Sequence, residues 1–274
     1  MARDKVVSVV FRSISYLLFV IVFIIFAFVI FDGIRFFSFG FFIQFPKDMM
    51  TEGGIFPAIL GSFYLLFLTL AISIPVGVLT GIFLSEYGDN RIGRLLDIAI
   101  TSLSGVPSIV FGLFGLALFS ITMGLKTSLI SGALTLSVMA LPIISSATKE
   151  ALKAIPDVLR ESAYALGAKK TEMIFKVILP AAKSRILTAV LIGSGRVMGE
   201  TAPVLLTAAV FYSTQLPGSI KDPVMTLPTH IYNIVMAYGA DAQWMAKGTA
   251  SVLMIVVLII YSFAFRLRRK INGN

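Results

Sequence analysis

The sequence predicts an all-α integral membrane protein with six transmembrane helices, and three observations support this fold class. The chain of 274 residues is 57% hydrophobic but only 14% charged, whereas a soluble domain has about 25% charged residues. Its apolar residues form continuous blocks, and most blocks reach the roughly 20 residues that a helix needs to cross a bilayer. Helices are expected because a backbone surrounded by lipid must satisfy its own hydrogen bonds.

Six blocks supply the predicted spans in chain order. Five of them carry no charge, and the fifth along the chain contains one arginine and one glutamate. The blocks are 13–31, 53–85, 98–125, 127–148, 186–211 and 248–265. The first follows the basic start MARDK, which would also suit a cleaved signal peptide, but its apolar core is too long and no A-x-A-like cleavage site follows. We therefore expect a retained first span.

Lys and Arg gather in the segments that six spans would place on one side. Of the 23 such residues, 17 lie in the N-terminus, in 85–97, in 149–185 and in the C-terminal tail. Positive charge is retained in cytoplasmic flanks, so both termini are predicted to be cytoplasmic. The net charge of +9 is thus a topology signal that requires no nucleic-acid partner. The basic tail 266–270 is compatible with contact to anionic membrane lipid, although a stop-transfer role explains it better.

Segment 149–185 is the only long segment predicted on the cytoplasmic side. Its pattern predicts two short amphipathic helices, one that starts after Pro156 and one over 171–178, and Pro180 is expected to close the unit. Gly167 is placed to end the first helix in a left-handed conformation. So small a unit cannot bury its own apolar face. It either packs onto the ends of the spans or is covered by a partner.

The same segment resembles the EAA loop of ABC importer permeases, whose signature is E-A-A, three residues, Gly, nine residues and I-x-L-P. Ser162 replaces an Ala of the signature and Val177 an Ile. The resemblance implies a type I ABC importer permease whose cytoplasmic coupling helix docks into a groove on a partner ATPase. The implied coupling residues are Glu161, Ser162, Ala163, Gly167, Leu179 and Pro180.

Two further stretches are similar to the phosphate permeases of the PstA family: 199–203 with the preceding Arg196, and 225–228. A third stretch, 105–112, resembles a sequence common to phosphate, sulfate and molybdate permeases. The likeness extends over roughly residues 60–265, while the first span and the loop 32–57 carry no motif. It implies two parts: 1–57 with the first span and an outer loop, and 58–274 with five helices and the coupling loop 149–185.

Arg196 and Glu200 form a charge pair inside the predicted fifth span. If that helix begins near Ile186, Arg196 lies about 16 Å along it, near the middle of a bilayer core of roughly 30 Å, and Glu200 follows one turn later on the same face. Charges at this depth should face protein or a water-filled path. One interpretation is an ion pair that only locks helix five. A span shifted to 201–220 is another, but the apolar ILTAVLIG before the pair argues against it.

We interpret Arg196, Glu200 and Thr201 as a substrate pathway for an oxyanion. A guanidinium matches the paired oxygens of a tetrahedral oxyanion. Glu200 would hold Arg196 and partly neutralise it, so that the ion is attracted and still released. Thr201 offers a hydroxyl.

The sequence lacks the residue patterns that nucleotide binding, catalysis, thiol chemistry and metal binding require. The sequence contains no G-x-x-x-x-G-K-[ST] phosphate loop, no plausible catalytic set, and no cysteine. His230, the single histidine, has no neighbours at metal-ligand spacing. We therefore expect no catalytic residue, no metal site and no cofactor in this chain, with ATP and Mg bound by the partner ATPase.

The resemblance implies the permease subunit of an ATP-driven phosphate importer in a prokaryotic plasma membrane. The implied partners are a PstC-type sister permease in a heterodimer, a PstB-type ATPase dimer and a PstS-type extracytoplasmic binding protein. Two alternatives remain open: a permease for molybdate or sulfate, which could be a homodimer, and a gradient-driven secondary carrier, against which the EAA-like loop argues. A membrane enzyme is disfavoured because it lacks a catalytic set.

Overall fold

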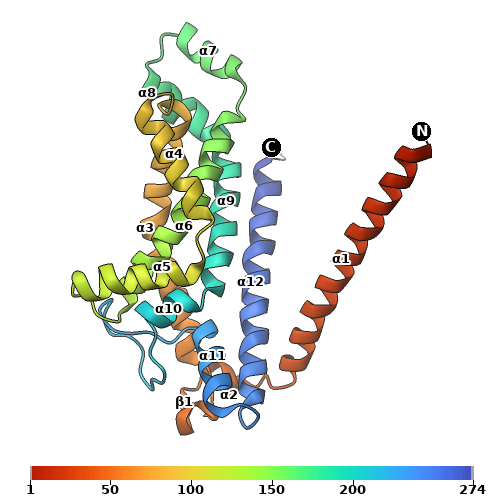
Figure 1. Cartoon of the computed structure of the whole chain (residues 1–274), viewed down its shortest axis with the longest axis vertical. Helices are drawn as coiled ribbons and strands as arrows, with labels where there is room; N and C mark the ends of the chain where they lie inside the picture. Colours follow the sequence, from red (N-terminus) through yellow and green to blue (C-terminus); the bar gives the residue numbers. More distant parts are fainter. Residues whose placement is uncertain (1, 273–274) are drawn as a thin grey trace.

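The computed structural model describes residues 2–272, with the side chains of residues 7–266, and it is built almost wholly of helices. Five long helices run along the molecule (Figure 1). They are α1 Ala2–Ile34, α3 Phe56–Glu86, α6 Leu129–Lys153, α9 Leu179–Gly199 and α12 Gln243–Asn272. The shorter helices are α2 Phe39–Ile43, α4 Arg91–Ser104, α5 Ser108–Gly115, α7 Asp157–Ala165, α8 Lys170–Glu172, α10 Ala202–Thr207 and α11 Leu227–Tyr238.

The remaining elements are short. A 3-10 turn η1 (Asp48–Met50) lies between β1 (Pro46–Lys47) and β2 (Glu52–Gly53), which pair antiparallel. Two π-helical segments, η2 (Leu116–Thr122) and η3 (Met173–Ile178), continue α5 and α8.

Four helices of the described chain are long and apolar enough to cross a membrane. They are the segments Val7–Ile34, Phe56–Glu86, Leu129–Lys153 and Gln243–Arg266. The run formed by α4, α5 and η2 adds a fifth if it counts as one span, but it is bent by 108°. The all-helical membrane fold is therefore confirmed, whereas the predicted count of six spans is not.

The bend in the third predicted block has a local cause. The sequence Gly105-Val106-Pro107 separates α4 from α5, and Pro107 lies just before α5 with an extended backbone. Proline cannot donate a backbone hydrogen bond, and it disfavours helical geometry in the residue before it. The predicted block 98–125 is therefore two helices that meet at an angle.

The fifth predicted block, 186–211, also differs from a single helix. α9 begins at Leu179, seven residues earlier than expected, and it is continuous with α8 and η3. Pro180 therefore lies in the first turn of α9 and does not close the coupling unit; the π-helical turn widens the backbone just ahead of the proline ring. At the other end, α9 stops at Gly199 because Pro203 would clash with the carbonyl of Gly199 in a continuous helix.

α3 and α6 form the tightest pair of the helix bundle. Gly77 and Gly81 of α3 let the backbones approach: a Cβ on Gly81 would lie 2.5 Å from Thr148 Cβ and 2.7 Å from the Ser145 carbonyl oxygen. Ser137 of α6 also donates a hydrogen bond of 3.1 Å to the Thr69 carbonyl oxygen in α3. These contacts make the pair a single packed body.

Gly81→Ala should destabilise the protein by about 1–3 kcal/mol, the usual result of overpacking a tight contact. Gly193→Ala in α9 is the matched control, because its nearest neighbouring atom lies 3.9 Å away, an ordinary contact. The midpoints of thermal unfolding in detergent compare the two variants. Equal midpoints for both would mean that the close approach of α3 and α6 contributes little to stability.

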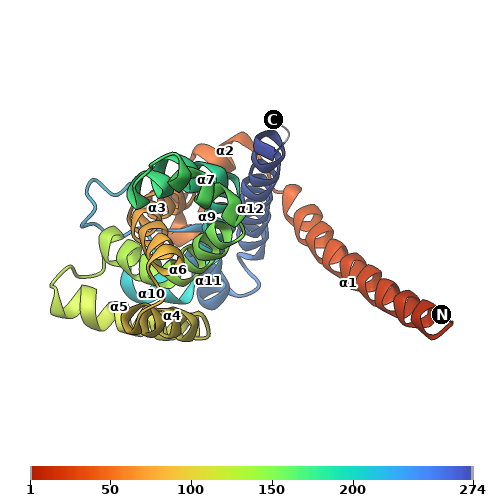
Figure 2. The same cartoon turned by 90° about the horizontal axis from the view of Figure 1, so that it is seen from above.

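α1 leans away from the bundle and is mostly surrounded by empty space in the single chain (Figure 2). Its contact with α12 is polar: Lys247 pairs with Asp32 at 2.9 Å, and Ser251 donates a hydrogen bond of 2.7 Å to the Val29 carbonyl oxygen. Segment 39–53 behaves differently, because Phe41 and Met50 are buried in a core shared with α11 and α12. The division of the chain at residue 57 stays a prediction.

The described ends of the chain lie toward the end of the molecule that carries α7 (Figure 1). The hairpin β1–β2, α2 and α11 lie at the opposite end. This arrangement agrees with termini on one side, and the assignment of that side to the cytoplasm stays a prediction.

Candidate functional site

Arg196 lies in the last turn of α9, on the face of the helix that its own chain leaves open. Ile192, Arg196 and Gly199 are exposed on this face, while Val197 and Met198 point into the core. The Arg196 side chain is 44% exposed. Its Nε donates to Glu200 Oε1 at 3.5 Å, the long limit of a hydrogen bond. The structure thus brings the predicted charge pair together.

Glu200 and Thr201 occupy the break between α9 and α10. Glu200 has an extended backbone (φ −73°, ψ 130°). The prediction that it continues the helix one turn beyond Arg196 is therefore wrong. Its side chain turns back toward Arg196 and is only 14% exposed. The carboxylate therefore holds one edge of the guanidinium from the inner side, and the opposite edge stays open.

Thr201 lines a groove of about 840 Å³ next to this break. The groove is mostly apolar, and its walls come from α5, α10, α11, α12 and the end of α9. The residues that represent these walls are Ile109, Gly199, Leu205, Tyr232 and Leu253. Arg196 lies one turn before Gly199 on α9, so the guanidinium is placed beside the groove and not inside it.

The open edge of Arg196 is chemically suited to an oxyanion. Within the described part of the chain, neither Nη of Arg196 holds a hydrogen bond. These two groups form the planar fork that binds paired oxygens of a phosphate-like ion. A pair at 3.5 Å with Glu200 leaves the charge only partly neutralised. The assignment of Arg196, Glu200 and Thr201 to a substrate pathway stays a prediction.

The first half of the coupling segment has the predicted local structure. α7 begins after Pro156, and Gly167 follows it with φ +81°, the left-handed conformation expected there. Ser162 and Glu161 are exposed, but Ala163 is buried against Ile155 and η3 of its own chain. Ala163 therefore does not lie on the outward face with Ser162, and Leu179 packs partly in the same core as Ala163.

Four large apolar side chains of α7 and of the residue after it are exposed beside polar ones. Val158, Leu159, Tyr164 and Leu166 are all exposed, and Leu166 is 89% exposed. The sequence left open whether this unit packs onto its own spans or awaits a partner. One side does pack, through Ala163, and the other side is free. An exposed apolar patch of this kind is typical of a protein–protein contact.

Two residues that fix α7 were not predicted from the sequence. Arg160 precedes the EAA-like triplet, and Glu86 is the last residue of α3. Their charges form an ion pair of 3.1 Å, although 74 positions separate them in the chain. The only sign of this contact in the sequence is the carboxylate of Glu86, which directly follows the uncharged block 53–85. That position does not indicate which basic residue pairs with it.

The described residues contain no group of three His, Cys, Asp or Glu side chains that could hold a metal ion. His230 is buried in α11, and its Nδ1 lies 3.2 Å from Thr249 Oγ1. Burial lowers the pKa of His230 to about 4, so its ring is neutral at physiological pH. It serves packing between α11 and α12.

Known proteins similar to this chain are membrane transport components. Residues 73–272 match the family described as binding-protein-dependent transport system inner membrane component. A probable ABC transporter permease protein of Bacillus subtilis, YqgI, is 35% identical over 248 residues, which cover 86% of this chain and 84% of the relative. The probable phosphate transport system permease protein PstA of Methanocaldococcus jannaschii is 36% identical over 219 residues, or 80% of this chain and 77% of the relative.

A solved structure shares the architecture at low sequence identity. A chain of the bacterial alginate ABC transporter, solved in complex with an alginate pentasaccharide-bound periplasmic protein, gives a TM-score of 0.69 at 16% identity. The match covers 98% of this chain and 96% of that chain. At this identity the likeness is one of fold.

Proposed function

Because the chain belongs to the family of binding-protein-dependent transport system inner membrane components, we propose that it is the permease subunit through which an ATP-driven importer moves inorganic phosphate into the cytoplasm. Members of this family are multi-pass transport subunits and not enzymes. The observation that most supports an oxyanion as the substrate is the placement of Arg196. Its guanidinium is partly neutralised, has an open edge, and lies beside a groove at a helix break.

The relatives support phosphate as the substrate. The Methanocaldococcus jannaschii relative, and others from Mycobacterium tuberculosis and Xylella fastidiosa at 34–35% identity, bear the name PstA and are phosphate transport permeases by that name. The motif around Arg196 and Glu200 is one of those by which the sequence resembles that family. A permease for molybdate or sulfate is the rival, since all three ions are tetrahedral oxyanions.

The exposed surfaces fit the proposed partners. The apolar side chains of α4 and α5, such as Ile92, Leu95, Ile98 and Leu113, are exposed in the single chain and would be covered by lipid or by a PstC-type sister permease. The free face of α7 would dock on a PstB-type ATPase dimer, which binds ATP and Mg. A PstS-type binding protein would deliver phosphate at the opposite end; the alginate transporter was likewise solved with a periplasmic protein.

Transport requires the two ends of the molecule to be coupled. ATP-driven closure of the ATPases would displace α7 and rock the bundle from an inward-facing to an outward-facing state. A partner can shift this equilibrium only if it docks differently on the two states. The proposal places α7 and both termini in the cytoplasm of a prokaryotic cell, in accordance with the excess of Lys and Arg there.

Competition between oxyanions in proteoliposomes tests the substrate. Vesicles that contain the complete complex should take up labelled phosphate only with ATP, and a 100-fold excess of sulfate or molybdate should leave that uptake unchanged, as expected when fixed donors recognise a specific oxyanion. Uptake of molybdate or sulfate in place of phosphate would contradict the proposal. A purified complex with a single type of permease would contradict the heterodimer.

A further inference from the structure

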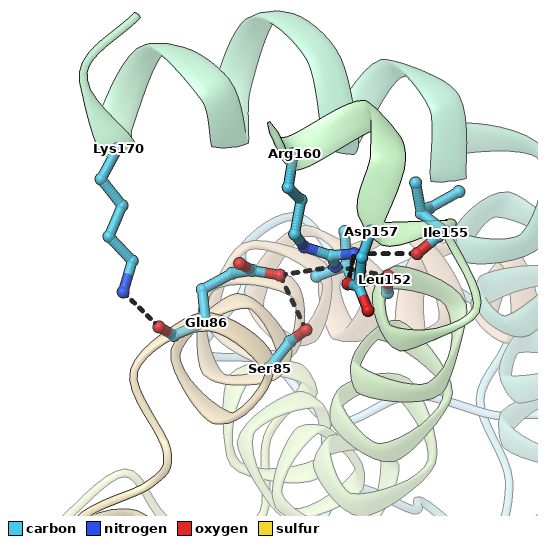
Figure 3. Close-up of polar contacts among 7 residues, drawn as sticks. All are labelled: Ser85, Glu86, Leu152, Ile155, Asp157, Arg160 and Lys170. Carbon is cyan, nitrogen blue, oxygen red and sulfur yellow. Dashed lines mark hydrogen bonds and ion pairs between the residues drawn. The ribbon is translucent and has the colours of Figure 1, made fainter. Parts of the chain in front are cut away.

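One guanidinium joins α7 to the ends of two long helices. Arg160 of α7 donates through Nη2 to Glu86 Oε1 at 3.1 Å and to the Leu152 carbonyl oxygen at 2.9 Å. Its Nη1 donates to the Ile155 carbonyl oxygen at 2.8 Å and to Asp157 Oδ1 at 3.2 Å. Leu152 belongs to the last turn of α6 and Glu86 ends α3, so the contacts reach both helices (Figure 3).

The Glu86 side of this contact is largely removed from solvent. Its side chain is 6% exposed and that of Arg160 is 17% exposed. Ser85 Oγ donates a second hydrogen bond of 2.9 Å to the same carboxylate oxygen of Glu86. A cation at the end of α6 is also favoured by the carbonyl groups that the last turn leaves unpaired. The pair is therefore a fixed structural contact, unlike a solvated surface ion pair.

The second half of the loop is fastened to the same helix end. Lys170, at the start of α8, donates to the Glu86 carbonyl oxygen (Figure 3). Its Nζ also lies 4.0 Å from the centre of the Tyr87 ring. Arg160 and Lys170 lie on the two sides of Gly167. The whole turn between α7 and α8 is thereby tied to the last residues of α3.

Apolar packing alone attaches α7 weakly. In α7, which the structure describes in full, Ala163 is the only buried residue, and it contributes one methyl group. The hydrogen bonds of Arg160 therefore make up most of the specific attachment. They lead to α3 and α6, which pack closely through Gly77 and Gly81 and so would move as one body.

We infer that Arg160 and Glu86 form the joint through which a displacement of α7 is passed to the α3–α6 pair. The inference rests on the proposed function, in which α7 is the helix that docks on the ATPase. Both residues act by positioning: neither touches the groove beside Arg196 nor belongs to the exposed apolar face of α7.

The ratio of phosphate transported to ATP hydrolysed tests this role, measured with the complete complex in proteoliposomes. Arg160→Gln and Glu86→Gln should each lower this ratio by at least about 5-fold, within the range by which residues between two coupled sites change their coupling. The ATPase should still co-purify in wild-type amount, because the docking face is unchanged. A role in folding alone would lower the yield of complex and leave the ratio unchanged.

Two further variants keep the test decisive. Glu86→Gln/Arg160→Met removes both charges, so no buried charge is left unpaired if the single variants fail to assemble. It should assemble and show the lowered ratio. Lys176→Gln is the matched control, since Lys176 forms an exposed pair with Glu172 in the same segment and, among the described residues, has no hydrogen bond or ion pair with α3. Its ratio should equal that of the wild type.

A wild-type ratio in any of these variants that assembles would overturn the joint, as would loss of the ATPase from the double variant. The proposed function fails by a different result: no ATP-dependent phosphate uptake by vesicles that contain the wild-type complex.

Discussion

Arg196→Gln should reduce phosphate uptake by roughly 10–100-fold, the loss expected when a hydrogen-bonded charge is removed from an ion-binding site. Glutamine keeps much of the length of arginine but presents neither the positive charge nor the paired donors. Because the Arg196 side chain is 44% exposed, the complex should still assemble with its ATPase. Initial rates of labelled phosphate uptake in proteoliposomes, normalised to the amount of complex, measure the effect.

Arg185→Gln is the matched control for this prediction. Arg185 is exposed on α9, eleven residues before Arg196, and at 100° per residue the two side chains point in nearly the same direction. Its loss should leave uptake close to the wild-type rate. Arg196→Lys, which keeps the charge without the fork, should give an intermediate rate. Uptake in Arg196→Gln equal to that in Arg185→Gln would remove Arg196 from the pathway.

Gly167→Val should weaken association with the ATPase about 10-fold or more. Gly167 has φ +81°, and a β-branched residue in the left-handed region is a conformational outlier that costs roughly 1–2 kcal/mol. A Cβ there would meet no atom within 4 Å, so the strain acts through the backbone turn and not through a clash. The turn should open and shift α7. Co-purification of the ATPase with tagged permease measures the association.

Gly167→Asn separates conformation from side-chain size. Asparagine tolerates the left-handed region far better than valine, so this variant should retain most of the ATPase. Equal retention by Gly167→Val and Gly167→Asn would show that the conformation of this turn does not control docking.

Much of the fold could be predicted because hydropathy and glycine carry local information. The uncharged blocks place α1, α3, α6 and α12 correctly, and the start of α7 after Pro156 and its end before Gly167 follow from rules that act within one turn. The type I ABC importer permease fold is confirmed by the family and by the solved relative.

The errors in the predicted helices arose where apolar composition does not determine where a helix bends or begins. Block 98–125 is uncharged throughout, and its bend depends on Pro107 and on the packing of α5 against α10 and α6. α9 extends back to Leu179 because the π-helical turn η3 accommodates Pro180 inside a helix, which a rule that treats proline as a stop cannot anticipate.

The candidate site was predictable only in part. Charge inside an apolar block is rare enough that Arg196 and Glu200 stand out in the sequence, and the structure places them together. The helix break at Glu200 depends on Pro203, four residues after Gly199. Because of this break, Glu200 contacts one edge of the Arg196 guanidinium from the inner side and does not lie one helical turn further on the same face. The contact between Glu86 and Arg160 joins segments far apart in the chain, so it becomes visible only once the helices are placed.

The most direct measurement concerns whether Arg196 faces the path of the ion. The chain contains no cysteine, so Arg196→Cys provides a unique thiol in this subunit when the partner subunits are also free of cysteine. Attachment of a cationic aminoethyl group to that thiol should restore part of the lost phosphate uptake, phosphate should slow the reaction, and a neutral reagent of equal size should restore nothing. A thiol that reacts in no state of the transport cycle, or equal recovery with both reagents, would contradict the account.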